Sequence, residues 1–165
     1  MSDLIIRRAT DKDINSLPAL MYELDRFHYE NNPEVYRTPE AMHSERVERN
    51  IFDHYRSGKF VVFLAVVDGK EVGMVSGLIK KMNSITSWPK TVGFVNELVV
   101  LPELRGGQAA TDLMAKIEQY FAEQGATEMG LNVSSFNERA QGLYKKLGYD
   151  YDSHLMIKPL AESRQ

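Results

Sequence analysis

One stretch of the sequence joins an apolar strand, a glycine turn and an amphipathic helix. Residues 98–101 read Leu-Val-Val-Leu and predict a strand that Pro102 ends. Residues 105–107 (Arg-Gly-Gly) predict a tight turn, and a helix is expected from Ala109 onward. Glycines let a backbone approach a ligand closely, and the N–H groups of a first helical turn carry the positive end of the helix dipole. With the charge of Arg105 beside it, this stretch predicts a site for a ligand that carries phosphates.

The composition narrows the classes of protein to consider. A chain of 165 residues is expected to form one domain over residues 1–165, large enough to bury a core without metals or disulfides. The absence of cysteine excludes disulfides, thiolate metal sites and a cysteine nucleophile. A net charge of −3 without a long basic run argues against general nucleic-acid binding.

The sequence also lacks several targeting and cofactor signals. It begins without the layout of a signal peptide, and no apolar run is long enough to cross a membrane, so the cytoplasm is the expected location. No zinc signature, Walker loop or dinucleotide fingerprint is present, and no metal site is therefore expected.

The hydrophobic pattern predicts ten elements in the order β-α-α-β-β-β-α-β-α-β. Thr10 and Asp13 form a capping box, Pro18 marks a kink or the start of a second helix, and Asp68-Gly69 predicts a hairpin turn. This order indicates an α/β sandwich with an antiparallel half and a strand–helix–strand half. The expected strands are 4–8, 60–67, 71–79, 92–101, 128–133 and 149–157, and the expected helices are 10–24, 38–56, 109–124 and 137–147, with a loop over 27–37.

A second informative stretch runs from Asn137 to Tyr149. Asn137 is a good N-cap, and Lys145 and Lys146 suit the negative end of the helix dipole. Taken alone, Tyr144 is best interpreted as an aromatic residue that packs on the core and finds one partner for its hydroxyl group.

Together, the two stretches resemble the motifs of the GCN5-related N-acetyltransferase family. In that family an acetyl-coenzyme A loop, Gln/Arg-x-x-Gly-x-Gly/Ala, follows a Val-x-Pro strand end. The likeness covers residues 5–160. The matching residues are Val100-Leu101-Pro102 and Arg105-Gly106-Gly107-Gln108-Ala109-Ala110 in the first motif, Asn137, Ala140, Leu143, Tyr144, Gly148 and Tyr149 in the second, and Met156, Lys158 and Leu160 at the C-terminal end.

One position departs from the family pattern. Gln108 stands where the family has the central glycine of its phosphate loop. If residue 108 adopts ordinary helical angles, its N–H group can still face a phosphate while Gly106 and Gly107 absorb the bend. Otherwise the affinity falls or the ligand shifts. We favour the first outcome, because Gly107 is a nearby substitute.

The resemblance implies a fold and a reaction. The fold is α/β (α+β), a single-domain mixed sheet with an antiparallel N-terminal half, a splayed parallel strand pair and helices on both faces. The reaction uses acetyl-coenzyme A as cosubstrate and moves the acetyl group directly to a primary amine of a small molecule or peptide, without an acyl-enzyme. Tyr144 matches the general acid that protonates the leaving thiolate. The implied cofactor-binding residues are Leu98, Val99, Val100, Arg105, Gly106, Gly107, Gln108, Ala109, Ala110, Asn137 and Tyr144.

The general base is less well defined by the sequence. Glu97, at the start of the central strand, could take the amine proton directly or through water, but a half-exposed strand glutamate paired with a cation is an equal alternative. The diamine acetyltransferase branch, which the chain resembles through Trp88, has glutamate one position earlier. That position is Asn96, which cannot take a proton, and strand alternation places residues 96 and 97 on opposite faces.

The acceptor amine is expected near the end of the first helical segment. Carboxylates and aromatic rings suit a cationic amine, although the same residues could be solvated loop residues or, for Trp88, part of a dimer contact. The candidates are His28, Tyr29, Glu30, Glu34, Tyr36 and Trp88. Homodimers are common in the family, and the sequence leaves that question open. A non-catalytic acyl-coenzyme A-binding or interaction domain on the same fold is the alternative function, favoured by Gln108 and Asn96.

Overall fold

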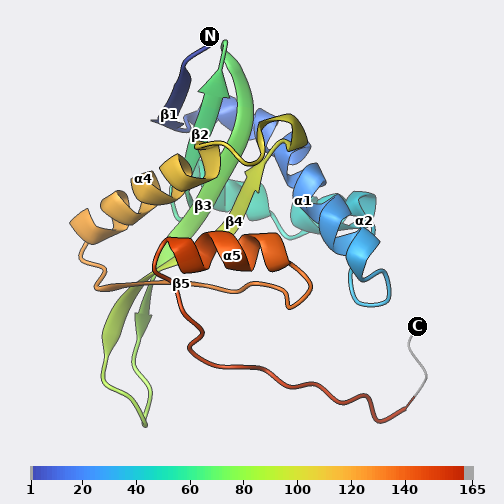
Figure 1. Ribbon diagram of the computed structural model, residues 1–165, viewed down its shortest axis with the longest axis vertical. Helices are drawn as coiled ribbons and strands as arrows, with labels where there is room; N and C mark the ends of the chain where they lie inside the picture. The colour runs from blue at the N-terminus through green and yellow to red at the C-terminus, as the bar shows by residue number, and fades with distance from the viewer. Residues whose placement is uncertain (1, 162–165) are drawn as a thin grey trace. The chain divides into compact units, whose positions relative to one another are not determined.

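The computed structural model describes residues 2–161 and divides into two compact units (Figure 1). The first unit ends at Asn132 and contains a five-stranded sheet in the order β1-β2-β3-β4-β5. Neighbouring strands are antiparallel except for β4 and β5, which are parallel, so the predicted mixed sheet is confirmed. The strands are β1 (Leu4–Arg8), β2 (Val61–Val67), β3 (Lys70–Met82), β4 (Lys90–Val100) and β5 (Glu128–Leu131).

The turn between β2 and β3 is the predicted hairpin. Asp68 and Gly69 have φ angles of 52° and 74°, which is the left-handed pair that a two-residue hairpin turn requires. The twist of such a turn matches the right-handed twist of the two strands that it joins. The turn therefore fixes the register of β2 against β3 from this end.

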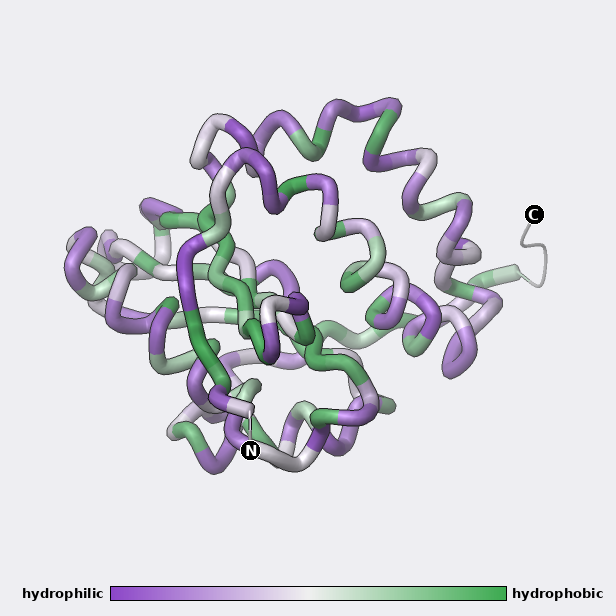
Figure 2. The backbone as a smooth tube through the Cα atoms, turned by 90° about the horizontal axis from the view of Figure 1, so that it is seen from above, coloured by the Kyte–Doolittle hydropathy of each residue, from purple (hydrophilic) through white to green (hydrophobic). Residues whose placement is uncertain are grey.

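The helices lie on both faces of the sheet. Met74 belongs to the core cluster that includes Leu17 of α1, whereas the adjacent Gly73 faces Leu113 of α4. Because neighbouring residues of a strand point to opposite faces, α1 and α4 cover opposite sides. In Figure 2 the helical segments change between hydrophilic and hydrophobic colours along their turns, as amphipathic helices do. The helices of the first unit are α1 (Leu17–Asn31), α2 (Pro39–Glu48), α3 (Ile51–Arg56) and α4 (Ala109–Glu123), with 3₁₀ turns at Asp11–Ser16 and Pro102–Leu104.

The helix starts follow their sequence signals. The capping box of Thr10 and Asp13 is present, and Pro18 stands at the first turn of α1, which is the second of its two predicted roles. Thr38 caps α2 by accepting a hydrogen bond from the N–H group of Ala41 at 3.2 Å.

Two predicted segments of the first unit were wrong. Residues 27–31 are the last turns of α1 and not a loop, and side-chain contacts such as the ion pair of Arg26 with Glu30 stabilise them. The single helix predicted over 38–56 is two helices, because Asn50 adopts a left-handed conformation with φ 55°.

The second unit starts at Val133 and contains α5 (Glu138–Lys146). The strand predicted over residues 149–157 is absent, and no strand pairing within residues 2–161 includes this segment. A strand needs a neighbour for its backbone groups, and the apolar side chains of Leu155, Met156 and Ile157 are exposed.

Glycine lets α4 pack closely on the sheet, and this can be tested. A Cβ atom on Gly93 of β4 would lie 2.5 Å from Cδ2 of Phe121, which is fully buried. We expect Gly93→Ala to lower the free energy of unfolding by about 1–3 kcal/mol in a denaturant titration. Gly142→Ala is the control: a Cβ atom there meets no heavy atom within 4 Å, and alanine favours a helix by about 0.5–1 kcal/mol. Equal stability of Gly93→Ala and the parent would contradict this packing.

Candidate active site

Strand β4 extends beyond its parallel neighbour. Its pairing with β5 runs from Val92 to Val95, where it meets Leu131, the last residue of β5, whereas β4 continues to Val100. The register against β3 also shifts here, because Gly77 pairs with Val95 while the preceding Ser76 pairs with Glu97. Asn96 is therefore the extra residue of a β-bulge, a feature that redirects side chains next to functional sites.

The backbone of β4 presents hydrogen-bonding groups along this edge. The N–H group of Leu101 donates to the carbonyl oxygen of Val72 in β3 at 2.8 Å. By alternation, Val99 also turns its backbone groups to β3, whereas Leu98 and Val100 turn theirs to the opposite edge, beyond the end of β5. Consistent with this, Arg105 Nε donates to the Val100 carbonyl oxygen at 3.2 Å. This edge can pair with a ligand that carries amide groups, as an added strand would.

At the start of α4, Gln108 adopts the first of the two conformations considered from the sequence. Gln108 has φ −85° and ψ −11°, ordinary right-handed helical angles, and Gly106 takes the bend with φ 83°. The first helical hydrogen bond runs from the N–H group of Asp112 to the Gln108 carbonyl oxygen at 2.8 Å. The N–H groups of Ala109 and Ala110 precede that bond, so they stand at the positive end of the helix dipole.

Glu97 lies in a buried polar cluster. The hydroxyl group of Tyr55, from α3, donates to the Glu97 carboxylate, with its oxygen 3.1 and 3.0 Å from Oε1 and Oε2. The hydroxyl group of Ser76, from β3, also donates to Oε2. The side chains of Tyr55 and Ser76 are buried.

An ion pair joins α1 to α2, and its charges act on the same carboxylate. Arg46 donates to both oxygens of Asp25, at 2.6 and 2.7 Å, and the Asp25 side chain is 7% exposed. This planar double contact is the geometry that guanidinium and carboxylate groups prefer. Arg46 and Asp25 act electrostatically on Glu97 with opposite signs.

The environment changes the acidity of Glu97. Burial raises its pKa above the ordinary value, while hydrogen bonds from Ser76 and Tyr55 and the charge of Arg46 act in the lowering direction. Burial, followed by the nearby charge of Glu97, also raises the pKa of Tyr55. Glu97 is thus a carboxylate with more basic character than an exposed one, as a proton acceptor needs.

Four members of this cluster were missed in the sequence. Asp25, Arg46, Tyr55 and Ser76 follow no local motif, and Tyr55 and Glu97 are 42 positions apart. The only signal was the position of Asp25 on the otherwise apolar face of the first helix.

The predicted acceptor residues fall into two groups. His28, Tyr29 and Glu30 lie in the last turns of α1, and the rings of His28 and Tyr36 are 5.0 Å apart. Trp88 lies instead in the loop between β3 and β4, and 90% of it is exposed.

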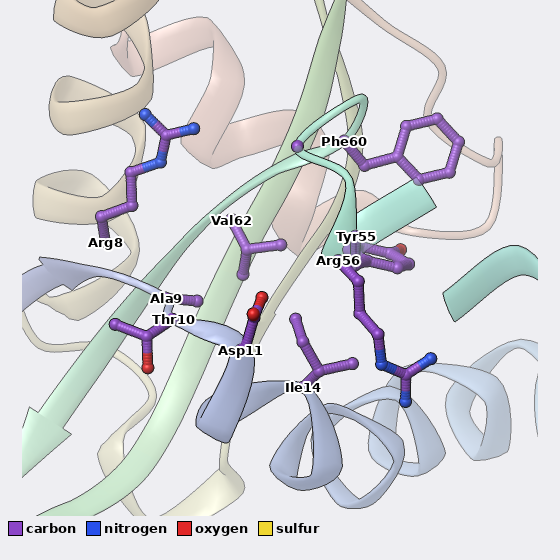
Figure 3. A pocket seen from close by; sticks show the side chains of 10 residues that line it. Arg8, Ala9, Thr10, Asp11, Ile14, Tyr55, Arg56, Phe60 and Val62 are labelled. Atoms are coloured by element: carbon purple, nitrogen blue, oxygen red, sulfur yellow. The ribbon is translucent and has the colours of Figure 1, made fainter. Parts of the chain in front are cut away.

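A pocket shares one residue, Tyr55, with the cluster around Glu97 (Figure 3). It measures about 130 Å³ and is lined by residues that include Arg8, Asp11, Tyr55 and Arg56. Tyr55 lines this pocket, and its hydroxyl group also donates to the Glu97 carboxylate. None of the residues predicted for the cofactor or acceptor lines it.

In the second unit, Tyr144 lies on α5. Asn137 caps this helix by accepting from the N–H group of Ala140 at 3.2 Å. The rings of Tyr144 and Tyr149 meet edge to face, with centroids 5.8 Å apart, and burial raises the pKa of Tyr144 to about 12. Tyr144 is therefore protonated at neutral pH and can donate a proton.

The part of the chain that the structure describes contains no group of three or more histidine, aspartate or glutamate side chains placed to hold a metal ion. Its helices include none that is long and apolar enough to cross a membrane.

Comparison with known proteins places the chain in a family. Residues 19–149 match the family model described as "Acetyltransferase (GNAT) family". Aminoalkylphosphonate N-acetyltransferase of Salmonella typhimurium is 29% identical over 157 residues, which are 94% of this chain and 90% of the relative. Thialysine N-epsilon-acetyltransferase of Bos taurus is 25% identical over 149 residues, 90% of this chain and 85% of the relative.

Solved structures share the fold. A mutant of the BH1408 protein from Bacillus halodurans superimposes with a TM-score of 0.82 at 21% identity, covering 95% of this chain and 99% of that one. The aminoglycoside N-acetyltransferase AAC(6')-Iy in complex with CoA has a TM-score of 0.72 at 20% identity, covering 96% and 95%.

Proposed function

Because this chain belongs to the GNAT family of acetyltransferases, we propose that it moves the acetyl group of acetyl-coenzyme A directly to a primary amine of a small molecule or peptide. The observation that carries this proposal is the combination of a strand edge and a helix start in β4 and α4. Relatives named for aminoalkylphosphonate and thialysine support a small amine as the acceptor.

Acetyl-coenzyme A fits the residues that are present. The N–H groups of Ala109 and Ala110, beyond the bend at Gly106, suit its pyrophosphate. The backbone groups of Leu98 and Val100 suit the amides of its pantetheine arm. When bound, the cosubstrate supplies an acetyl thioester whose carbonyl carbon an amine can attack.

Two side chains would carry out the proton transfers of this reaction. Glu97, whose pKa burial raises, would accept a proton from the incoming amine. Tyr144, which is protonated at neutral pH, would donate a proton to the departing thiolate. His28, Tyr29, Glu30, Glu34 and Tyr36, with Trp88, remain the proposed acceptor residues.

Two measurements test this function. Isothermal titration calorimetry with acetyl-coenzyme A should show binding, and a thiol-release assay against amines, amino acids, polyamines, aminoglycosides and aminoalkylphosphonates should show turnover. No heat at high micromolar cosubstrate would refute the proposal. Binding without turnover on any acceptor would favour the non-catalytic acyl-coenzyme A-binding domain.

The glycine turn makes a specific prediction about Gln108. Since Gln108 has ordinary helical angles, Gln108→Gly should change the Kd for acetyl-coenzyme A by no more than about fivefold, the backbone-entropy cost of one glycine. Gly106→Val is the matched variant: φ 83° strains a branched side chain by about 1–3 kcal/mol, so its Kd should weaken about tenfold or more. A tenfold gain in affinity for Gln108→Gly would show instead that the Gln108 side chain obstructs the ligand.

A further inference from the structure

Four elements each contribute one polar side chain to the cluster around Glu97. Tyr55 comes from α3 and Ser76 from β3, and both hydroxyl groups donate to the carboxylate. Asp25 and Arg46, from α1 and α2, form an ion pair whose charges act on the same carboxylate.

We propose that Tyr55 is a positioning residue that holds the Glu97 carboxylate at the bulge of β4. The inference rests on the proposed function, in which Glu97 accepts the proton of the acceptor amine. Tyr55 acts through Glu97 and has no contact with the reacting atoms in this mechanism.

The geometry of Tyr55 supports a positioning role. Its hydroxyl oxygen is nearly equidistant from the two carboxylate oxygens, at 3.1 and 3.0 Å. This contact therefore fixes the orientation of the whole carboxylate group and not the position of a single oxygen atom. Its ring packs edge to face on Phe60, with centroids 5.2 Å apart, and lies 6.1 Å from the ring of Phe52. A ring packed against two aromatic neighbours cannot turn its hydroxyl group away without disturbing the core.

The position of Glu97 also favours such a clamp. Asn96 is the extra residue of the β-bulge, where the regular ladder that would orient a side chain is interrupted. Side-chain hydrogen bonds from Tyr55 and Ser76 replace that backbone constraint.

The charges around Glu97 predict opposite effects for different substitutions. Hydrogen bonds to a carboxylate stabilise its charged form, so removing the Tyr55 hydroxyl group should raise the pKa of Glu97. The negative charge of Asp25 disfavours the charged form, so removing it and leaving Arg46 should lower this pKa. A purely structural role for these residues predicts no such difference in sign.

The first experiment is a direct titration of Glu97 without cosubstrate or acceptor. The carboxyl carbon of Glu97 is followed by ¹³C NMR in the full chain and assigned with Glu97→Gln. The Glu97 carboxyl group should titrate at higher pH in Tyr55→Phe than in the parent, and at lower pH in Asp25→Asn. Tyr120→Phe is the matched control, because Tyr120 lies on α4, where its ring packs on Phe63 and Phe121. In this variant Glu97 should titrate as it does in the parent. Unchanged titration in Tyr55→Phe would overturn the proposal.

The second experiment is the pH profile of kcat/KM for acetyl transfer. Tyr55→Phe should move the acid limb to higher pH and lower kcat/KM by about tenfold on that limb, as expected for a lost hydrogen bond to a charged group. Asp25→Asn should move the limb to lower pH. If burying an unpaired Arg46 prevents folding of Asp25→Asn, Ser76→Ala replaces it and should move the limb in the same direction as Tyr55→Phe.

The outcomes separate the two proposals. A parent protein without acetyl transfer refutes the proposed function, while the NMR titration still tests the cluster. A parent that is active, with Glu97→Gln inactive and Tyr55→Phe identical to the parent at every pH, refutes the positioning role and leaves the proposed function intact.

Discussion

Glu97→Gln is expected to lower kcat for acetyl transfer by about 10²–10⁴-fold, the usual contribution of a positioned general base. The amide keeps the size of the side chain and can still accept hydrogen bonds from Tyr55 and Ser76, but it cannot take a proton at neutral pH. The Kd for acetyl-coenzyme A should not change, because its proposed contacts lie in the glycine turn and the edge of β4. Steady-state kinetics and calorimetry measure the two quantities separately.

The control for this variant is Glu123→Gln. Glu123 is an exposed residue at the end of α4, on the face of the sheet opposite the cluster, so its substitution should leave kcat unchanged. A Glu97→Gln protein with the turnover of the parent would show that another group, or water alone, accepts the amine proton.

The same variant should have a recognisable effect on stability. Burial raises the pKa of Glu97 in the folded protein above its value in the unfolded chain. The folded state therefore binds this proton more tightly, and the contribution of Glu97 to the free energy of unfolding falls as the pH rises from below the unfolded pKa through the folded pKa. Glutamine does not titrate, so Glu97→Gln should gain stability relative to the parent at pH 8 but not at pH 4. Such a gain with a loss of turnover is typical of a residue kept for function.

Local signals explain which parts of the fold the sequence predicts correctly. The turn at Asp68-Gly69 and the cap at Asn137 depend on residues next to one another, and both appear in the structure. The glycine turn before α4 is local for the same reason, so the conformation of Gln108 could be expected from the two glycines before it.

Other parts of the fold were not readable from the sequence. The left-handed Asn50 breaks a segment whose composition suits one helix, and residues 27–31 are helical although their composition is typical of a loop. The segment 149–157, which ends in three apolar residues, was predicted as a strand, but pairing depends on a neighbour that the sequence does not identify.

The same limit applies to the candidate site. Glu97 could be selected from its place on the strand, but whether its side chain was exposed or enclosed by polar groups depended on distant residues. The structure answers this with Tyr55 and Ser76, which lie 42 and 21 positions away, and with the ion pair of Asp25 and Arg46. No period or motif connects these four residues, so their convergence on Glu97 is a property of the fold alone.

Tyr144→Phe is expected to lower kcat by a factor in the same range, about 10²–10⁴, with little change in the Kd for acetyl-coenzyme A. Burial raises the pKa of Tyr144 to about 12, so the hydroxyl group carries its proton throughout the neutral range and can protonate a basic thiolate as it leaves. Phenylalanine keeps the ring and its edge-to-face contact with Tyr149 but has no proton to give. Calorimetry and stopped-flow thiol release measure binding and transfer independently.

Tyr149→Phe is the matched control for this last variant. It removes a hydroxyl group from the partner ring, 5.8 Å away, without touching the proposed proton donor. If Tyr144 is only a packed aromatic residue, the two variants should behave alike, with similar turnover and similar thermal midpoints. If Tyr144 is the general acid, Tyr144→Phe alone should lose turnover. Its deficit should also shrink with an acetyl thioester of a more acidic thiol, because a weakly basic leaving group needs less help from an acid.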